Sequence, residues 1–195
     1  MTLPSYIQRA FEPPTAIASP ILREAAAYWL NLVPPKGLPT FGALDPVEMP
    51  KEIIPCLWVV DCPNGEATFR FRLAGERIAK VFNHRVRGRP LDDVFETSPP
   101  ECREAVRARF DHVTRNEMVC YCQGTVYVEN GLDGQGERLI LPLTDRRADA
   151  VTHLLGVTDF AVDKAPRIAP RDPQVAEHYF TPEILAVLCQ KSSTL

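Results

Sequence analysis

The sequence predicts an α+β domain in which one antiparallel sheet carries the central helices on a single face. Three observations support this fold class. Two short strand patterns joined by a turn signal come early, helical spacing dominates the middle of the chain, and three longer strand patterns follow in succession. Strands that succeed one another across short turns pair antiparallel, so we expect a meander at the end.

A first helix is predicted from about Pro20 to Val33. Ser19 suits the cap, Pro20 suits the first turn, and apolar residues then recur at helical spacing. Two consecutive prolines end the pattern. The apolar stripe of this helix includes Trp29 and must be buried, either on its own domain or on a second subunit.

Two strands are predicted next, at residues 56–62 and 69–75. The first reads CLWVVDC and is rich in β-branched and aromatic residues, while the second reads FRFRLAG and alternates between apolar and basic residues. An Asn-Gly pair between them is typical of a hairpin turn. Strict alternation would place Phe69, Phe71 and Leu73 on one face and the arginines on the other.

Helical spacing replaces alternation in the middle of the chain. Two short helices are predicted from the apolar sets Ile78, Val81, Phe82 and Leu91, Val94, Phe95. A longer helix is predicted to start at Ser98, because Ser-Pro-Pro-Glu has the form of a capping box, and to end near Asn116. Its apolar stripe comprises Cys102, Val106, Phe110 and Val113.

Three strands are predicted after this helix, at residues 118–129, 137–145 and 150–162. A glycine-rich turn and a short charged turn connect them, which favours the antiparallel meander. A last helix is expected to begin at Thr181, with Pro182 in its first turn.

The chain of 195 residues is long enough for one domain with terminal extensions. Most of its 19 prolines lie towards the two ends, which favours a compact centre with irregular arms. We therefore divide the chain into an irregular N-terminal arm (1–19), a central domain that includes the first helix (20–162), and a proline-rich segment that ends in a helix (163–195).

Composition and charge argue against several classes of function. The formal net charge of -3 does not suit nucleic-acid binding, although residues 69–90 hold seven basic side chains and one acidic one. No apolar run approaches the ~20 residues of a membrane helix, and the first residues lack the features of a secretory signal, so we expect a cytoplasmic protein. The six cysteines lack CxxC spacing and are expected to be reduced thiols.

Five stretches stand out for their order along the chain. They are the helix carrying Tyr28 and Trp29, LPTFGALDPVEMPKEIIPCLWVVD, FRFRLAGERI, GRPL ahead of the central helix, and LILPLTDRRADAVTHLLGV. In this order they resemble a PAS domain, and in particular the PAS-like family of alphaproteobacteria, over roughly residues 20 to 162.

The resemblance implies a five-stranded antiparallel sheet with a pocket between its curved face and the short helices. It also implies a sensory or regulatory module rather than an enzyme, which either binds a small ligand in its core or acts as a protein–protein adaptor. The ligand and any cofactor are unknown from the sequence. Without an output domain of its own, the module is expected to act on a signalling partner or as a homodimer.

Eight residues are predicted to border the implied pocket. They are Phe71, Leu73, Phe82, His84, Val94, Phe110, Cys120 and Cys122. Cys120 and Cys122 share one face of a strand, and their parallel side chains suit packing better than a disulfide. Haem or metal ligation by His84 is the alternative at that position, but no second ligand follows it at a predictable spacing, so no metal site is predicted.

Two other classes of function stay open. An enzyme on an α+β scaffold would use His84 or His153 as general base, oriented by a carboxylate inside an open cleft. The arginine-rich joint formed by Arg85, Arg87 and Arg89 could instead bind an anionic ligand, an acidic partner or nucleic acid.

Overall fold

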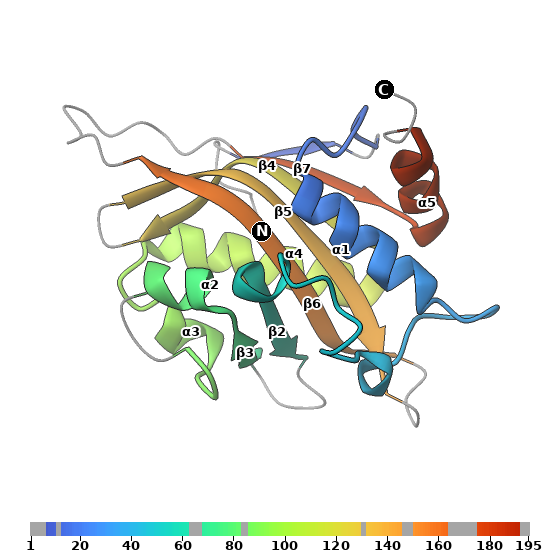
Figure 1. The fold of residues 1–195 in the computed structure, drawn as a ribbon. Coiled ribbons are helices and arrows are strands. Elements are labelled where there is room, and N and C mark those ends of the chain that lie inside the picture. Colours follow the sequence, from blue (N-terminus) through green and yellow to red (C-terminus); the bar gives the residue numbers. More distant parts are fainter. Residues whose placement is uncertain are drawn as a thin grey trace.

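The protein folds around a curved sheet of seven strands (Figure 1). The computed structural model describes residues 7–10, 13–62, 68–82, 86–129, 132–145, 150–163 and 175–191. The strands are β1 (Ile7–Ala10), β2 (Leu57–Asp61), β3 (Arg70–Ala74), β4 (Val119–Glu129), β5 (Leu132–Thr144), β6 (Val151–Asp163) and β7 (Val175–Phe180). The helices are α1 (Pro20–Asn31), α2 (Glu76–Val81), α3 (Leu91–Val94), α4 (Pro100–Asn116) and α5 (Pro182–Lys191), with short 3-10 turns η1 (Phe41–Ala43) and η2 (Ile54–Cys56).

The sheet order is β1-β7-β4-β5-β6-β2-β3, and every neighbouring pair from β7 to β3 is antiparallel. The five strands from β4 to β3 are those that the sequence predicts, so the α+β class and the antiparallel meander are confirmed. The sheet is nevertheless wider than the expected five strands. β7 pairs with β4, and β1 adds to β7 in parallel, so the terminal segments 1–19 and 163–195 each contribute a strand.

The middle helices share one face of the sheet, as predicted. We call this the inner face; α4 packs on it through Phe110, whose ring centroid lies 5.4 Å from that of Trp58 on β2. The opposite, outer face carries α1, where Trp29 donates a hydrogen bond of 3.3 Å to the Pro142 carbonyl of β5. Figure 1 shows α1 in front of β5 and α4 behind the sheet.

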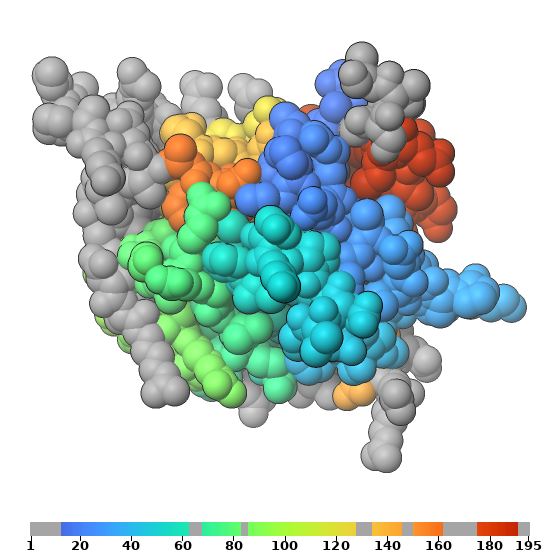
Figure 2. Space-filling model, in the orientation of Figure 1, coloured from blue at the N-terminus to red at the C-terminus, as the bar shows by residue number. Residues whose placement is uncertain are grey.

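The first helix buries its apolar stripe on its own domain. Ser19 caps α1 by accepting from the Leu22 amide at 3.3 Å, and Trp29 is fully buried. α5 packs beside α1, and Figure 2 shows α1 and the segment that follows it covering much of the outer face. The stripe therefore does not need a second subunit for its burial.

The strict alternation expected for β3 is wrong at its end. The register between β2 and β3 shifts at Val59 and Val60, so Arg72 is an extra residue between the paired positions Phe71 and Leu73. Such a bulge interrupts the regular pleat. Phe71 is buried as expected, but Leu73 is 42% exposed.

The central helix ends at Asn116 as predicted, but the capping box at its start is wrong. Pro99 occupies the cap position and gives no side-chain hydrogen bond, while the Ser98 hydroxyl is buried without a partner in the described part of the chain. The helix starts one residue too late for Ser98 to serve as its cap. No helix among the described residues has the length and apolar character to cross a membrane.

Candidate functional site

The predicted pocket residues lie mainly in the core under the inner face. Six of them are buried, namely Phe71, Phe82, Val94, Phe110, Cys120 and Cys122. Leu73 lies at the surface instead, because it follows the bulge in β3. His84 falls outside the residues that the structure describes. The buried six contribute to the core rather than to the pocket that the structure describes at the outer face.

Aromatic rings fill much of the inner-face core. Phe82 meets Tyr127 of β4 edge to face at 5.8 Å, and Tyr127 meets Phe160 of β6 at 5.0 Å between ring centroids. On the other side, Phe110 lies between Trp58 and Phe69. These edge-to-face and tilted contacts are favourable for aromatic side chains. The polar ends of Trp58 and Tyr127 then need hydrogen-bond partners inside the core.

Those polar ends converge on one hydroxyl group. Trp58 Nε1 lies 3.1 Å from Thr158 Oγ1, Arg138 Nε lies 3.0 Å from the same oxygen, and the Tyr127 hydroxyl lies 3.4 Å from it. We call these four residues the Thr158 cluster. A hydroxyl oxygen accepts two hydrogen bonds and donates one. Two N–H groups use both acceptor positions, which leaves the Thr158 hydroxyl hydrogen for the contact with the Tyr127 oxygen.

Arg138 is the unusual member of the cluster, because it is a charged residue only 4% exposed. Nη2 donates to the Val126 carbonyl at 2.6 Å, and the guanidinium lies 4.5 Å from the Tyr127 ring centroid and 6.0 Å from that of Trp58. All of its partners in the described chain are neutral. Buried charges are normally paired, so this guanidinium is the strongest candidate for contact with a ligand.

A second buried arginine on the same face is fully paired. Arg109 of α4 lies 2.8 Å through Nε and 2.6 Å through Nη2 from Glu177 Oε1 of β7, and the Tyr179 hydroxyl donates to Glu177 Oε2 at 2.6 Å. Cys120 and Cys122 lie beside this pair with their sulfur atoms 3.6 Å apart, and burial raises the pKa of Cys120. The pair joins the central helix to a strand that the sequence reading missed.

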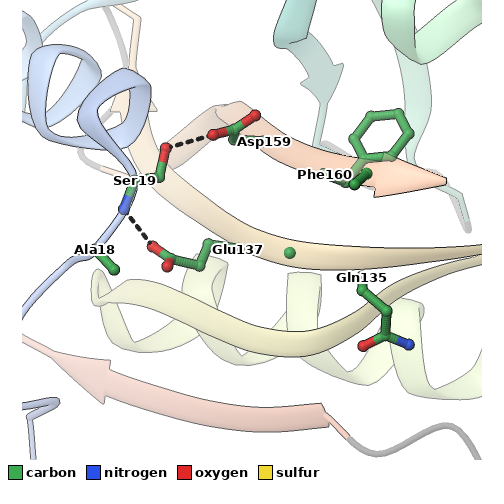
Figure 3. Close-up of a pocket in the computed structure, with 8 residues that line it drawn as sticks. Ala18, Ser19, Gln135, Glu137, Asp159 and Phe160 are labelled. Atoms are coloured by element: carbon green, nitrogen blue, oxygen red, sulfur yellow. Dashed lines mark hydrogen bonds between the residues drawn. The ribbon is translucent and has the colours of Figure 1, made fainter. Parts of the chain in front are cut away.

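A pocket of about 400 Å³ opens on the outer face, where the start of α1 meets β5 and β6 (Figure 3). It is lined by Ala18, Ser19, Gln135, Gly136, Glu137, Asp159, Phe160 and Ala161, none of which was predicted. Ser19 donates through its amide to Glu137 at 3.0 Å and through its hydroxyl to Asp159 at 2.8 Å. Arg77 of α2 also pairs with Asp159 at 3.3 Å, so this acidic pair already has internal partners.

Of the two candidate general bases, His153 lies among the described residues, and its ring is packed against neighbouring side chains. Its ring stacks on Phe41 at 4.3 Å, and Nε2 lies 3.4 Å from Asp61 Oδ1, an oxygen that also receives Arg72 Nε at 2.6 Å. Burial lowers the pKa of His153. A carboxylate is therefore near the imidazole, but the described pocket does not include it. Among the described residues, no group of three metal-ligating side chains could hold an ion.

Most of the described basic side chains of residues 69–90 contact other residues of the fold. The contacts are Arg70 to the Gly88 carbonyl, Arg72 to Asp61, Arg77 to Asp159, Lys80 to Glu76, and Arg89 to Glu96. Arg85 lies outside the described residues. These contacts match the reading of the segment as the surface of a strand and its connections.

The sequence reading missed all four residues of the Thr158 cluster. Arg138 shares its strand face with Ile140 and Pro142, and a basic residue in phase with apolar ones is a signal of inward placement. The opposite face of the same strand carries leucines that are also buried. Because both faces are covered, alternation alone does not reveal which way Arg138 points.

Comparison with known proteins gives one family match and a distant structural likeness. No curated protein sequence matches this chain. A chain in a structure titled as an RNA-binding Light-Oxygen-Voltage receptor shares 16% sequence identity and a TM-score of 0.40, over 83% of this chain and 41% of that chain. The present chain thus spans less than half of that receptor's length. Residues 17–158 match the family described as PAS domain, and this chain belongs to the PAS domain family.

Proposed function

We propose that this sensory or regulatory module binds a small ligand at the Thr158 cluster and passes the bound state to another protein. Membership of the PAS domain family supports the regulatory role. The observation that carries the ligand part is the convergence of Trp58, Tyr127 and Arg138 on the single oxygen of Thr158. A few polar groups that converge within apolar surroundings are the kind of groups that orient ligands in proteins.

The rings above the cluster suggest how a ligand would act on the rest of the molecule. Tyr127 packs on Phe82, which ends α2, and on Phe160, which also lines the outer pocket. A ligand that displaces Tyr127 would therefore disturb both rings. α2 is fastened to β6 by Arg77, which donates to the Phe160 carbonyl at 2.6 Å. Movement of α2 is thus the expected surface change.

Native mass spectrometry of the full chain, freshly purified from cells, tests this proposal. We expect an additional small mass on the wild type that is lost from Thr158→Val, because valine keeps the shape but removes the shared acceptor. Thr114→Val is the matched control: Thr114 is on α4, where its hydroxyl donates to the Phe110 carbonyl at 2.8 Å. This variant should keep the adduct. A wild type without any adduct, and without a thermal shift across a set of metabolites, would refute ligand sensing.

A second candidate function is a protein–protein adaptor without a ligand. The dense ring packing around Phe82, Phe95 and Tyr127 favours it, because these contacts leave the core well filled. An adaptor would bind its partner equally well as wild type and as Thr158→Val. Under either function, we propose that the protein is one of the alphaproteobacterial PAS-like proteins, that it is cytoplasmic and that it forms a homodimer. Sedimentation of the full chain tests the dimer.

A further inference from the structure

We infer that the ligand of the Thr158 cluster is a small anion with a carboxylate group, and that Arg138 binds this carboxylate. This inference rests on the proposed function, because it names the chemical class of ligand for the same site. It starts from the charge and the donors of Arg138, neither of which is matched within the described chain.

The guanidinium group offers five N–H donors and a permanent positive charge. Arg138 uses Nε for Thr158 Oγ1 and Nη2 for the Val126 carbonyl, while Nη1 has no acceptor among the described residues. The two acceptors are neutral. The rings of Tyr127 and Trp58 stabilise the cation only through their faces. An anion would supply the missing charge and the missing acceptors together.

Arg109 shows what a fully compensated arginine looks like in this core. It is 5% exposed at its side chain and lies against Glu177, whose side chain is 0% exposed. Arg138 is equally deep and lacks a carboxylate in the described part of the chain. Among the described residues, the inner face therefore places two buried guanidinium groups against one buried carboxylate, a difference that one bound monoanion would remove.

Cys122 is the other group near Arg138 that could carry a negative charge. The two residues lie opposite each other on β4 and β5. Contact with the Cys120 thiol, followed by the charges of Arg109 and Arg138, lowers the pKa of Cys122, against the effect of its burial. A thiolate there would make a bound anion unnecessary, so the test includes a variant without this thiol.

The geometry favours a carboxylate on a small apolar body. A guanidinium group presents paired donors that match the two oxygens of a carboxylate. The Tyr127 hydroxyl meets the Thr158 oxygen beside Arg138 at 3.4 Å, the longest contact of the cluster, and can supply a further donor. The surrounding Phe82, Phe110 and Phe160 rings suit an apolar or aromatic remainder.

Calorimetric titration and thermal shift of the full chain with benzoate test the inference, with uncharged benzamide and inorganic phosphate as comparisons. We expect benzoate to bind and to raise the melting temperature, and benzamide to do neither. Phosphate should bind more weakly than benzoate, because its oxygens lack an apolar body. Equal responses to benzoate and benzamide, or stronger binding of phosphate, would overturn the carboxylate assignment.

Variants of Arg138 separate a specific contact from a general salt effect. Arg138→Lys keeps the charge but loses the paired donors, so its affinity for benzoate should fall by about tenfold or more. Arg138→Met should abolish binding while the unliganded chain melts no lower than wild type, because a buried unpaired charge is replaced by an apolar side chain. Arg107→Met on the exposed side of α4, where Arg107 pairs with Asp92 at 2.7 Å, should bind benzoate normally.

The failures of the two proposals are distinguishable. A cellular adduct that is lost in Thr158→Val but kept in Arg138→Met would overturn the carboxylate assignment and leave ligand sensing intact. The absence of both adduct and anion binding would overturn both proposals. Benzoate binding that appears only after Cys122→Ala would identify the Cys122 thiolate as the partner of Arg138 and would also overturn the assignment.

Discussion

Arg109 and Glu177 form an ion pair of 2.6 Å in the core, and it joins the central helix to the last strand. Neither side chain is appreciably exposed. Since each charge is compensated by the other, loss of either side chain would leave an uncompensated charge in the core.

Removing one charge of this pair should destabilise the fold. Glu177→Gln leaves the Arg109 cation buried without a counter-charge, and we expect a loss of about 3 kcal/mol in the free energy of unfolding. Urea unfolding of the full chain measures it. Asp92→Asn is the control, because it breaks the more exposed pair with Arg107 and should cost under about 1 kcal/mol. Equal costs for the two variants would show that the buried pair has no special role.

Two residues from the predicted pocket set should differ sharply when truncated. Phe110→Ala removes a buried ring that packs against Trp58 at 5.4 Å and Phe69 at 5.3 Å, so about 3–5 kcal/mol of stability should be lost. Leu73→Ala should change stability by within about 0.5 kcal/mol, because Leu73 lies at the surface after the bulge. Chemical denaturation compares them, and a large cost for Leu73→Ala would contradict the bulged register.

A methyl group at Gly156 should disturb the Thr158 cluster. The Cβ of an alanine there would overlap the ring of Trp58, which donates to Thr158. We expect Gly156→Ala to cost about 1–3 kcal/mol through overpacking and to shift the tryptophan fluorescence. Gly42→Ala, where an added Cβ meets nothing within 4 Å, should leave the spectrum unchanged. Identical spectra for both variants would argue against the close approach of Gly156 to Trp58.

Stability should decrease in mild acid because of His153. Burial and the nearby Arg72 lower its pKa, although Asp61 acts in the opposite direction. The unfolded chain therefore binds a proton more readily than the folded protein. Stability is full above the ordinary histidine pKa of about 6.5 and falls as the pH drops through that value. His153→Gln should reduce the difference in unfolding free energy between neutral and mildly acidic buffer. The same difference in the variant and the wild type would refute the assignment to His153.

The elements that the sequence predicts well are those with one clear pattern. α1 and α4 carry a single apolar stripe, and the central strands carry β-branched runs between turn signals. β7 was missed because Glu177 occupies a fully buried position, and an acidic residue there hides the alternation. β1 is four residues long and gives too short a pattern to recognise.

The candidate site was less predictable than the fold, for a physical reason. An inward arginine and a surface arginine look alike in a sequence, and only the packing around Arg138 distinguishes them. Leu73 shows the converse problem, since a bulge in β3 altered a pattern that was regular in the sequence. Register shifts and buried charges depend on partners distant in the chain, which local patterns do not report.

The parallel pairing of β1 with β7 bears on how the chain assembles during synthesis. Ile7 lies opposite Val175, so β1 cannot pair with its neighbour until the segment around Val175 has also been synthesised. The central meander, in which each strand follows its neighbour closely, can form before that moment. The β1 edge of the sheet is therefore completed after the meander, although β1 precedes the meander in the chain.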